Sequence, residues 1–409
     1  MIIPMAERME GVRASEIREL LKFTARSEVI SFAGGLPAPE LFPVREIEAA
    51  AVSALDHEGA RVLQYSTTEG DPRLREIIAA RMNRVRGTSR TADEVLVTAG
   101  SQQGLDLSGK IFLDAGDVVL CESPTYIGAI QALRIFQPRF IEVPTDDDGM
   151  IIEALARRLA AEPRARVIYV VPDFQNPTGR RWPTERRRAL LEAAARHPVV
   201  VIEDSPYAEL AFDGPPLPAI QSLDEHGQVV YLGTFSKTFC PGLRLGWVAG
   251  PKELVEKYVL VKQGADLHTS TLPQRLLQLY LDRHDFDAHI QRIRTLYHRR
   301  RNVMLEAMDR FFPPGVRYTR PQGGLFLWVE LPEQLNARDL LTASLAENVA
   351  FVPGGAFFPN GGHEHTIRLN FSNMPEERIR EGIQRLARVI RNFLTDAPVA
   401  ETASVDARA

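Results

Sequence analysis

The middle of the chain, from about residue 94 to residue 237, alternates short apolar runs with stretches of helical pattern. The apolar runs are continuous and rich in Val and Ile, as at 199–202, instead of alternating between apolar and polar residues. Strands of that kind are buried on both faces of a sheet, and the helices between them connect one parallel strand to the next. The sequence therefore predicts an α/β fold with a large, mainly parallel sheet and crossover helices.

The pattern changes near residue 251, where long helical stretches replace the short alternation. Strands are expected again at 323–331, 349–355 and 366–372, with helices at 337–347 and 375–393, which predicts a second, smaller α+β domain. The run at 243–251 follows the preceding strand too closely for a crossover helix, so it could be an antiparallel member of the large sheet.

Four regions follow from this pattern. We expect an N-terminal arm at 1–45 that joins the small domain, a large domain at 46–290, a small domain at 291–395 and a disordered tail at 396–409.

Charge and cysteine content narrow the setting. The chain has 409 residues, with 49 Lys and Arg against 53 Asp and Glu, which gives a formal net charge of −4. That balance argues against nucleic acid or an acidic membrane as a partner, and no apolar run approaches the ~20 residues of a membrane span. Cys121 and Cys240 are too few for a disulfide framework, and the N-terminus lacks a signal-peptide pattern, so a cytoplasmic protein is expected.

The most informative segment is 233–246, where Lys237 directly follows an apolar strand. An unpaired buried ammonium is costly, and a lysine with a lowered pKa is what Schiff-base chemistry requires. Hydroxyls at Thr234 and Ser236, together with Arg244, could hold a phosphate while the amine reacts. The alternative is a surface lysine beside a turn, and this segment alone leaves that alternative open.

Other expected strands bring polar groups to the same sheet edge. Strands end near Asn176 and Asp204, and the carboxyl ends of parallel strands are where open α/β sheets bind ligands. Tyr207 follows Asp204 by three residues, whereas Asn176 begins an Asn-Pro-Thr-Gly segment that read alone is a turn. Ser101 and Gln102 begin an expected helix, where free N–H groups favour a phosphate, although a plain serine cap explains them equally well.

Three weaker signals are set aside. Residues 104–111 nearly match a phosphate-binding loop, but Ile111 replaces the required hydroxyl and the stretch is expected to be helical. His363-Glu364-His365 lacks the helical i, i+4 spacing of a zinc site, so no metal is expected. Cys240 is interpreted as a small packing residue.

The chain resembles the fold-type-I, pyridoxal-phosphate (PLP)-dependent aminotransferases of class I/II. Within that group it is most similar to the 2-aminoadipate aminotransferases of bacterial lysine biosynthesis and to the kynurenine/2-aminoadipate aminotransferases. The resemblance covers residues 10–395 and rests on SFAGGLPAPELFP (31–43), LQYSTTEGDPRLRE (63–76), VTAGSQQGLDL (97–107), PDFQNPTG (172–179), EDSPYAEL (203–210), GTFSKTFCPGLRLGW (233–247), KQGADLHTS (262–270) and IRLNFS (367–372). It implies ping-pong transfer of an amino group between an L-amino acid and 2-oxoglutarate.

The same resemblance implies roles around the cofactor. Lys237 would form a Schiff base with PLP and then move the proton, and Asp204 would pair with the pyridinium nitrogen. Tyr207 and Asn176 would hydrogen-bond the ring oxygen, while Tyr126 would stack on the ring. The phosphate would be held by Ser101, Gln102, Thr234, Ser236 and Arg244.

It also implies how substrate and subunits are arranged. Arg368 would clamp the substrate α-carboxylate in a planar two-bond fork, a geometry that lysine cannot supply. Asn176 would lie beside that carboxylate, and Gly35 would let the backbone come close to it. Tyr65 would reach the phosphate of the neighbouring subunit, which implies a homodimer with shared active sites.

Near the N-terminus, Ser15 and Arg18 are three residues apart and would share one face of a helix. Spacing alone favours a surface helix with an ordinary cap. The resemblance implies instead that the arm covers the active site and that Arg18 meets the distal carboxylate of a long acidic substrate.

Two other functions stay open at this point. A regulator with an aminotransferase-like domain would only sense PLP, but about thirty residues before Ser31 are too few for a separate DNA-binding domain. A PLP-dependent lyase or decarboxylase would share Lys237, because the bond that breaks is the one that stands perpendicular to the ring. The preferred amino donor, and the choice between lysine biosynthesis and broader catabolism, do not follow from the sequence.

Overall fold

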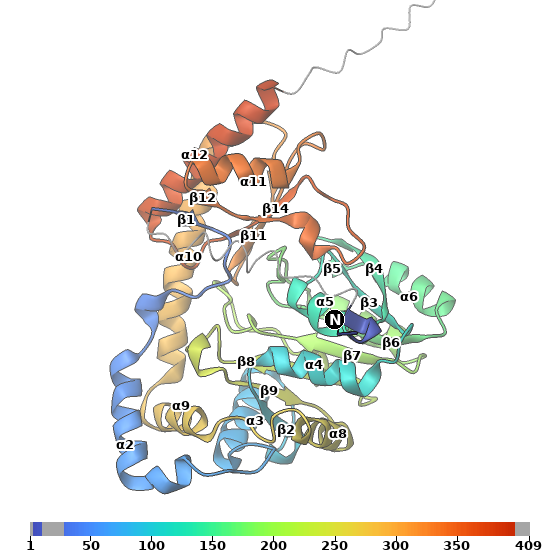
Figure 1. Ribbon diagram of the computed structural model, residues 1–409, viewed down its shortest axis with the longest axis vertical. Coiled ribbons are helices and arrows are strands. Elements are labelled where there is room, and N and C mark those ends of the chain that lie inside the picture. Colours follow the sequence, from blue (N-terminus) through green and yellow to red (C-terminus); the bar gives the residue numbers. More distant parts are fainter. Residues whose placement is uncertain (1–2, 10–27, 397–409) are drawn as a thin grey trace, which may run out of the picture.

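The computed structural model describes residues 3–9 and 28–396, and within them a large sheet lies in the lower half of the view in Figure 1. Its strand order in the described chain is β2-β9-β8-β7-β6-β3-β4-β5. The strands are β2 (Val95–Thr98), β3 (Val118–Ser123), β4 (Arg139–Asp146), β5 (Gly149–Met150), β6 (Ala165–Val170), β7 (Val200–Asp204), β8 (Val229–Thr234) and β9 (Gly246–Ala249). β4, β3, β6, β7 and β8 run parallel, whereas β9 is antiparallel to both of its neighbours. The predicted mainly parallel sheet and its antiparallel member are both confirmed.

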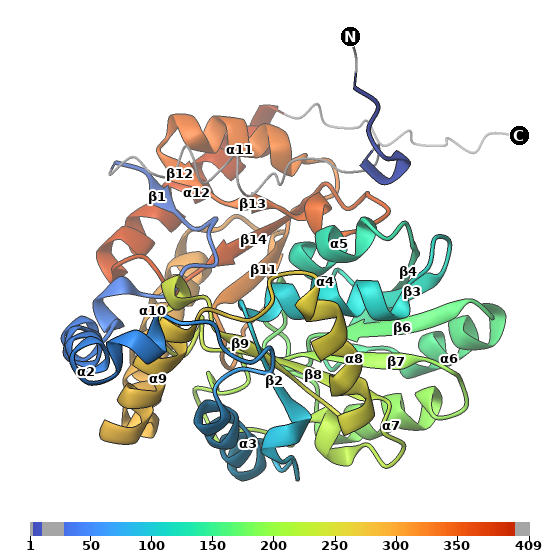
Figure 2. The same ribbon diagram turned by 60° about the horizontal axis from the view of Figure 1, so that its bottom comes forward.

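Helices cover both faces of this sheet because its strands are apolar on both. α4 (Ser101–Phe112), α5 (Ile127–Arg134) and α8 (Lys252–Gln263) lie over one face, where a core cluster joins them to alternate strand residues such as Tyr169 and Ile202 (Figure 2). α6 (Ile152–Ala161) and α7 (Thr184–Ala194) cover the other face and pack on the intervening residues, such as Ile168 and Val201. Neighbouring residues of one strand therefore belong to different layers.

Three further helices complete the large domain beside the sheet. They are α2 (Val44–Val62), α3 (Pro72–Arg86) and α9 (Thr271–Arg283). Asp71 caps α3 by accepting a hydrogen bond from the Leu74 N–H at 3.0 Å, and Gly87 ends it in a left-handed conformation. α2 packs against α9 through a separate apolar cluster that contains Ala54 and Leu276.

The small domain lies above the sheet edge and is reached through the 26-residue helix α10 (Phe286–Phe311) (Figure 1). Its four-stranded sheet has the order β10 (Arg317–Tyr318), β11 (Phe326–Glu330), β14 (Thr366–Asn370), β13 (Val352–Pro353), and its other helices are α11 (Ala337–Ala346) and α12 (Glu376–Asp396). β1 (Ile30–Ser31) pairs in parallel with β12 (Val349–Ala350), so the chain before the large domain contributes to the small one. The expected single strand at 349–355 is wrong: it divides into β12 and β13, which pair in different sheets, before a 3₁₀ turn at Gly354–Phe357.

The predicted disordered C-terminal tail at 396–409 falls, apart from Asp396, outside the described residues. None of the helices in the described ranges is long and apolar enough to cross a membrane.

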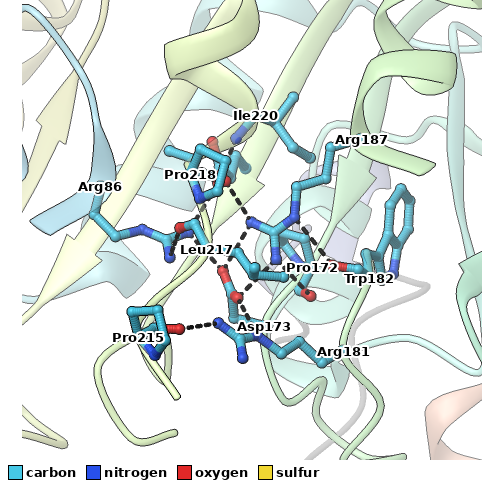
Figure 3. Close-up of polar contacts among 12 residues, drawn as sticks. Arg86, Pro172, Asp173, Arg181, Trp182, Arg187, Pro215, Leu217, Pro218 and Ile220 are labelled. Atoms are coloured by element: carbon cyan, nitrogen blue, oxygen red, sulfur yellow. Dashed lines mark hydrogen bonds and ion pairs between the residues drawn. The ribbon is translucent and has the colours of Figure 1, made fainter. Parts of the chain in front are cut away.

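A buried ion cluster anchors the loop at 172–182, which follows β6 (Figure 3). The Asp173 carboxylate is fully buried and accepts from Arg86 Nη2 at 2.6 Å, Arg187 Nη2 at 2.7 Å and Arg181 Nε at 3.4 Å. Burial alone would raise the pKa of Asp173, but the charges of Arg187 and Arg86 outweigh it and hold this pKa well below its usual range. The cluster ties the loop to α3 and α7, three residues before Asn176.

We expect Asp173→Asn to destabilise the protein by about 3–5 kcal/mol, because it leaves buried guanidinium groups without their counter-charge. The free energy of unfolding at pH 7, measured with denaturant, tests this. A carboxylate with a depressed pKa contributes its full stability above the unfolded value near 3.9 and loses it as the pH falls from there through the lower pKa of the folded state, so the two proteins should converge only in strong acid.

Asp147→Asn is the matched control. Asp147 pairs with Arg180 at 2.9 Å, but its side chain is 95% exposed, so its loss should cost less than about 1 kcal/mol. Equal losses in the two variants would contradict a special role for the buried cluster.

Candidate active site

A cavity of about 420 Å³ lies between the carboxyl edge of the large sheet and the small domain. Parallel strands deliver the ends of β6, β7 and β8 to this edge, and β11 and β14 close it from the small domain. Ten of the fifteen site residues predicted from the sequence line it: Gly35, Gln102, Tyr126, Asn176, Asp204, Tyr207, Ser236, Lys237, Arg244 and Arg368.

Asp204 ends β7 in the wall of the cavity and is only 2% exposed. Its Oδ2 accepts a hydrogen bond from the Tyr169 hydroxyl at 2.8 Å, whereas its buried Oδ1 has no partner in the described chain. Burial raises the pKa of Asp204 to about 7, and the Tyr169 hydrogen bond opposes that rise. A buried acceptor left open beside a cavity fits a protonated ring nitrogen.

Lys237 follows β8 and is partly buried, with its Nζ donating to the Gly35 carbonyl at 2.8 Å. Burial lowers the pKa of Lys237 to about 8, and the positive charges of Arg368 and Arg244 act in the same direction. A substantial fraction of this amine is therefore neutral in mildly alkaline solution, which a nucleophilic lysine requires.

One end of the cavity has the features of an anion site. α4 begins there with its free N–H groups, preceded by Gly100 at φ +81°, and a Cβ at Gly100 would lie 2.6 Å from Arg244 Nη2. Among the described residues, the exposed Arg244 guanidinium makes two long hydrogen bonds, both at 3.4 Å and both to backbone carbonyls. The Ser236 hydroxyl also lines this region, and Gly246 allows the backbone to approach Ser101 N closely. These donors fit a phosphate group.

The side chains of two predicted phosphate ligands, Thr234 and Ser101, are not part of the cavity lining. The Thr234 hydroxyl does not line the cavity: it contacts Ser236 Oγ at 3.0 Å and donates toward the Leu245 carbonyl at 3.2 Å. It therefore supports Ser236 from below. Ser101 contributes the first residue of α4, next to Gln102, whose Nε2 donates to the Gly128 carbonyl at 2.8 Å.

Arg368 projects from β14, and hydrogen bonds and aromatic rings fix the plane of its guanidinium. Its Nη1 donates to Asn176 Oδ1 at 2.9 Å and its Nη2 donates to the Ala33 carbonyl. The guanidinium carbon lies 4.2 Å from the ring centre of Phe326 and 5.1 Å from that of Phe357. A planar cation fixed in this way can bind a carboxylate.

The three remaining predicted residues are Tyr65, Ser15 and Arg18. Tyr65 does not line the cavity: its side chain is 78% exposed and meets the ring of His268 edge-on at 5.8 Å. Ser15 and Arg18 lie outside the described residues. Sequence reasoning missed Tyr169 and Phe326, although a tyrosine within the Val-rich run 166–171 was a usable signal for the first.

Comparisons with known proteins agree with this geometry. The profile of the family "Aminotransferase class I and II" matches residues 35–386. A 2-aminoadipate transaminase of Thermus thermophilus is 47% identical over 386 residues, which are 94% of this chain and 95% of that protein. An aromatic-amino-acid aminotransferase of Thermococcus litoralis is 42% identical over 390 residues, 94% of each chain.

Solved structures give the same result. The crystal structure of Pyrococcus horikoshii kynurenine aminotransferase in complex with PMP has a TM-score of 0.91 at 41% identity, covering 95% of this chain and 97% of that one. An α-aminoadipate aminotransferase of Thermus thermophilus, complexed with N-(5'-phosphopyridoxyl)-L-leucine, has a TM-score of 0.90 at 45% identity, covering 96% and 98%.

This chain therefore belongs to the class I and II aminotransferases. It is a PLP-dependent aminotransferase of fold type I, which confirms the family, fold, enzyme class and cofactor that the sequence resemblance implied.

The lowered pKa of Lys237 gives a test on the apoprotein. Acetylation of Lys237, followed by peptide mass spectrometry across a pH series, should reach half its maximal rate near pH 8, whereas a lysine in water titrates near 10.4. In Arg368→Gln the half-point should move to higher pH, because one of the repelling cations is gone. A half-point at pH 10 or above in the unaltered protein would contradict this account of the amine.

Proposed function

We propose that this enzyme transfers the amino group of 2-aminoadipate, or of another bulky L-amino acid such as kynurenine, to 2-oxoglutarate. The observation that best supports this proposal is that Lys237, Asp204 and Arg368 line one cavity. The amine of Lys237 has a lowered pKa, Asp204 has an open buried oxygen, and the guanidinium of Arg368 is fixed by its neighbours. The names of the similar proteins support the substrate class, because they include 2-aminoadipate, kynurenine and aromatic-amino-acid aminotransferases.

The cofactor roles follow from the described contacts. Pyridoxal phosphate, when bound, supplies an aldehyde that accepts the amino group and a ring that withdraws electrons. We assign its attachment to Lys237 Nζ, which also moves the proton released from the substrate Cα. The open Oδ1 of Asp204 would hold the proton of the ring nitrogen.

The remaining cavity residues orient these groups. Asn176 and Tyr207 are hydrogen-bonded neighbours and would meet the ring oxygen of the cofactor. Tyr126, which packs over Gly128 in the cavity wall, would stack on the ring. The phosphate would meet Gln102, Ser236 and Arg244, with Ser101 and Thr234 supporting them.

Apart from Asp204 and three cations, the described lining of the cavity is uncharged. Lys237, Arg244 and Arg368 are the cations in its described lining, and each already has a role. Leu36, Ile127 and Gln131 also line it, which suits a bulky apolar or neutral side chain. We propose that a distal carboxylate would be met by Arg18, with Ser15 beside it, on an N-terminal arm that would cover the site.

We propose that the enzyme is a homodimer with shared active sites. Leu63, Tyr65 and Leu267 are large apolar side chains that are exposed in the single chain, and the Tyr65–His268 contact brings their segments together. A second copy of the chain would cover this surface and would place Tyr65 near the phosphate end of the other cavity.

We also propose a cytoplasmic setting. Cys121 and Cys240 are free and buried. Burial raises the pKa of Cys240 to about 12, so its thiol stays protonated and serves as a packing group.

Subunit mixing tests the shared site. Lys237→Ala and Tyr65→Ala chains, each inactive or nearly so alone, should recover about a quarter of wild-type activity per chain after equal mixing, because half the dimers then hold one intact site. The control pairs Lys237→Ala with Arg368→Ala. Lys237 and Arg368 line the cavity of their own chain, so each site of a mixed dimer keeps one of the two defects and no intact site forms. Recovery in both pairs, or in neither although the subunits exchange, would contradict Tyr65 sharing.

A donor screen tests the substrate class. The purified enzyme, with 2-oxoglutarate as acceptor, should convert 2-aminoadipate, and Lys237→Ala should abolish that activity. Arg18→Ala should raise KM for 2-aminoadipate and glutamate by roughly 10- to 150-fold, the loss of one hydrogen bond between charged groups, while sparing leucine and phenylalanine. Equal losses for acidic and apolar donors would place acidic recognition elsewhere, and no turnover of bulky donors would exclude the proposed substrate class.

A further inference from the structure

Asp204 has an unusual environment for a buried carboxylate. Of the three cations that line the cavity, none forms an ion pair with it, and its described hydrogen bonding consists of the Tyr169 contact at 2.8 Å. A buried carboxylate with so little compensation tends to take up a proton, as its raised pKa shows. The group that opposes this tendency is the hydroxyl of Tyr169.

The sheet fixes the position of that hydroxyl. β6 and β7 are parallel neighbours with Tyr169 opposite Ile202, so Tyr169 and Asp204 lie on the same face and meet diagonally. Tyr169 is 1% exposed and packs within the core cluster under α4 and α5. Burial and the nearby Asp204 charge hold the pKa of Tyr169 well above its usual range, so its oxygen keeps the proton and acts as the donor.

The two oxygens of Asp204 are therefore not equivalent. Tyr169 occupies Oδ2, and Oδ1 is buried without a partner beside the cavity. A carboxylate with one oxygen held cannot rotate freely, so the open acceptor keeps one direction. Without that contact, the carboxyl would be freer to rotate and easier to protonate.

We propose that Tyr169 is a positioning residue for the cofactor ring, because it holds Asp204 ionised and oriented with Oδ1 free for the ring nitrogen. The inference rests on the proposed role of Asp204. Tyr169 does not line the cavity and acts only through the carboxylate. The alternative is that Tyr169 is a core residue whose hydroxyl only satisfies a buried acceptor.

A double-mutant cycle separates the two. Tyr169→Phe, Asp204→Asn and the double variant are compared with wild type by titrating each apoprotein with pyridoxal phosphate and by single-turnover reaction with an amino donor. Tyr169→Phe should weaken cofactor affinity roughly 10-fold in the Asp204 background and by less than about twofold in the Asn background. In steady state its kcat should fall while KM for the donor changes little, because Arg368 is untouched.

Tyr258→Phe is the matched control. Tyr258 is also a fully buried tyrosine, and its hydroxyl bonds to Ser108 at 2.7 Å on α4, away from the cavity. Its removal should lower the thermal unfolding midpoint about as much as Tyr169→Phe does, without weakening cofactor binding. Circular dichroism establishes that every variant is folded before it is titrated.

Each outcome is decisive. An equal loss of affinity in both Asp204 backgrounds, or an unchanged affinity and kcat in Tyr169→Phe, would overturn the positioning role. If Asp204→Asn impairs cofactor binding but Tyr169→Phe does not, only this inference fails. If Asp204→Asn itself binds the cofactor and turns over like wild type, the proposed role of Asp204 fails as well.

Discussion

The site depends on the parallel order of three adjacent strands, β6, β7 and β8. Because they run the same way, their carboxyl ends meet at one edge, and residues far apart in the sequence become neighbours there. Asn176, Asp204 and Lys237 each follow or end one of these strands, about thirty residues apart along the chain. An antiparallel arrangement would have sent alternate members of this set to the opposite edge.

Successive side chains of each strand point to opposite faces of the sheet, so the two faces have different roles. Asp204 faces the cavity, whereas its neighbour Glu203 faces the opposite layer, where it accepts from the backbone N–H groups of Ile220 and Gln221. Glu203 also lies 3.6 Å from Arg86, which belongs to the Asp173 cluster. The loop at 172–182 is thus held from one side by buried ion pairs and from the other by the Asn176–Arg368 contact with the small domain.

The sequence predicted most of what depends on local pattern and little of what depends on register. Continuous Val and Ile runs marked the sheet strands, and the resemblance identified the residues that meet in the cavity. No helices were assigned between residues 44 and 86, where α2 has a kink at Glu58 and α3 relies on its Asp71 cap and its packing. The Tyr169–Asp204 contact could not be predicted, because the pairing of β6 with β7 is set by tertiary packing. Both Thr234 and Ser236 were expected at the phosphate. The sequence shows two nearby hydroxyls but not which of them faces the cavity, and only Ser236 lines it in the described chain.

Charge balance links these parts of the site. The cavity brings together Lys237, Arg244 and Arg368 against a single acidic side chain, Asp204, so its described lining carries an excess of positive charge. Burial lowers the pKa of Lys237 most, and this excess of positive charge lowers it further. The same excess suits two anionic groups, a phosphate at Arg244 and a carboxylate at Arg368. Each anion that binds offsets part of the repulsion on the amine. The readiness of Lys237 to accept or release a proton therefore depends on what the two arginines hold, which couples occupancy of both ends of the site to the group between them.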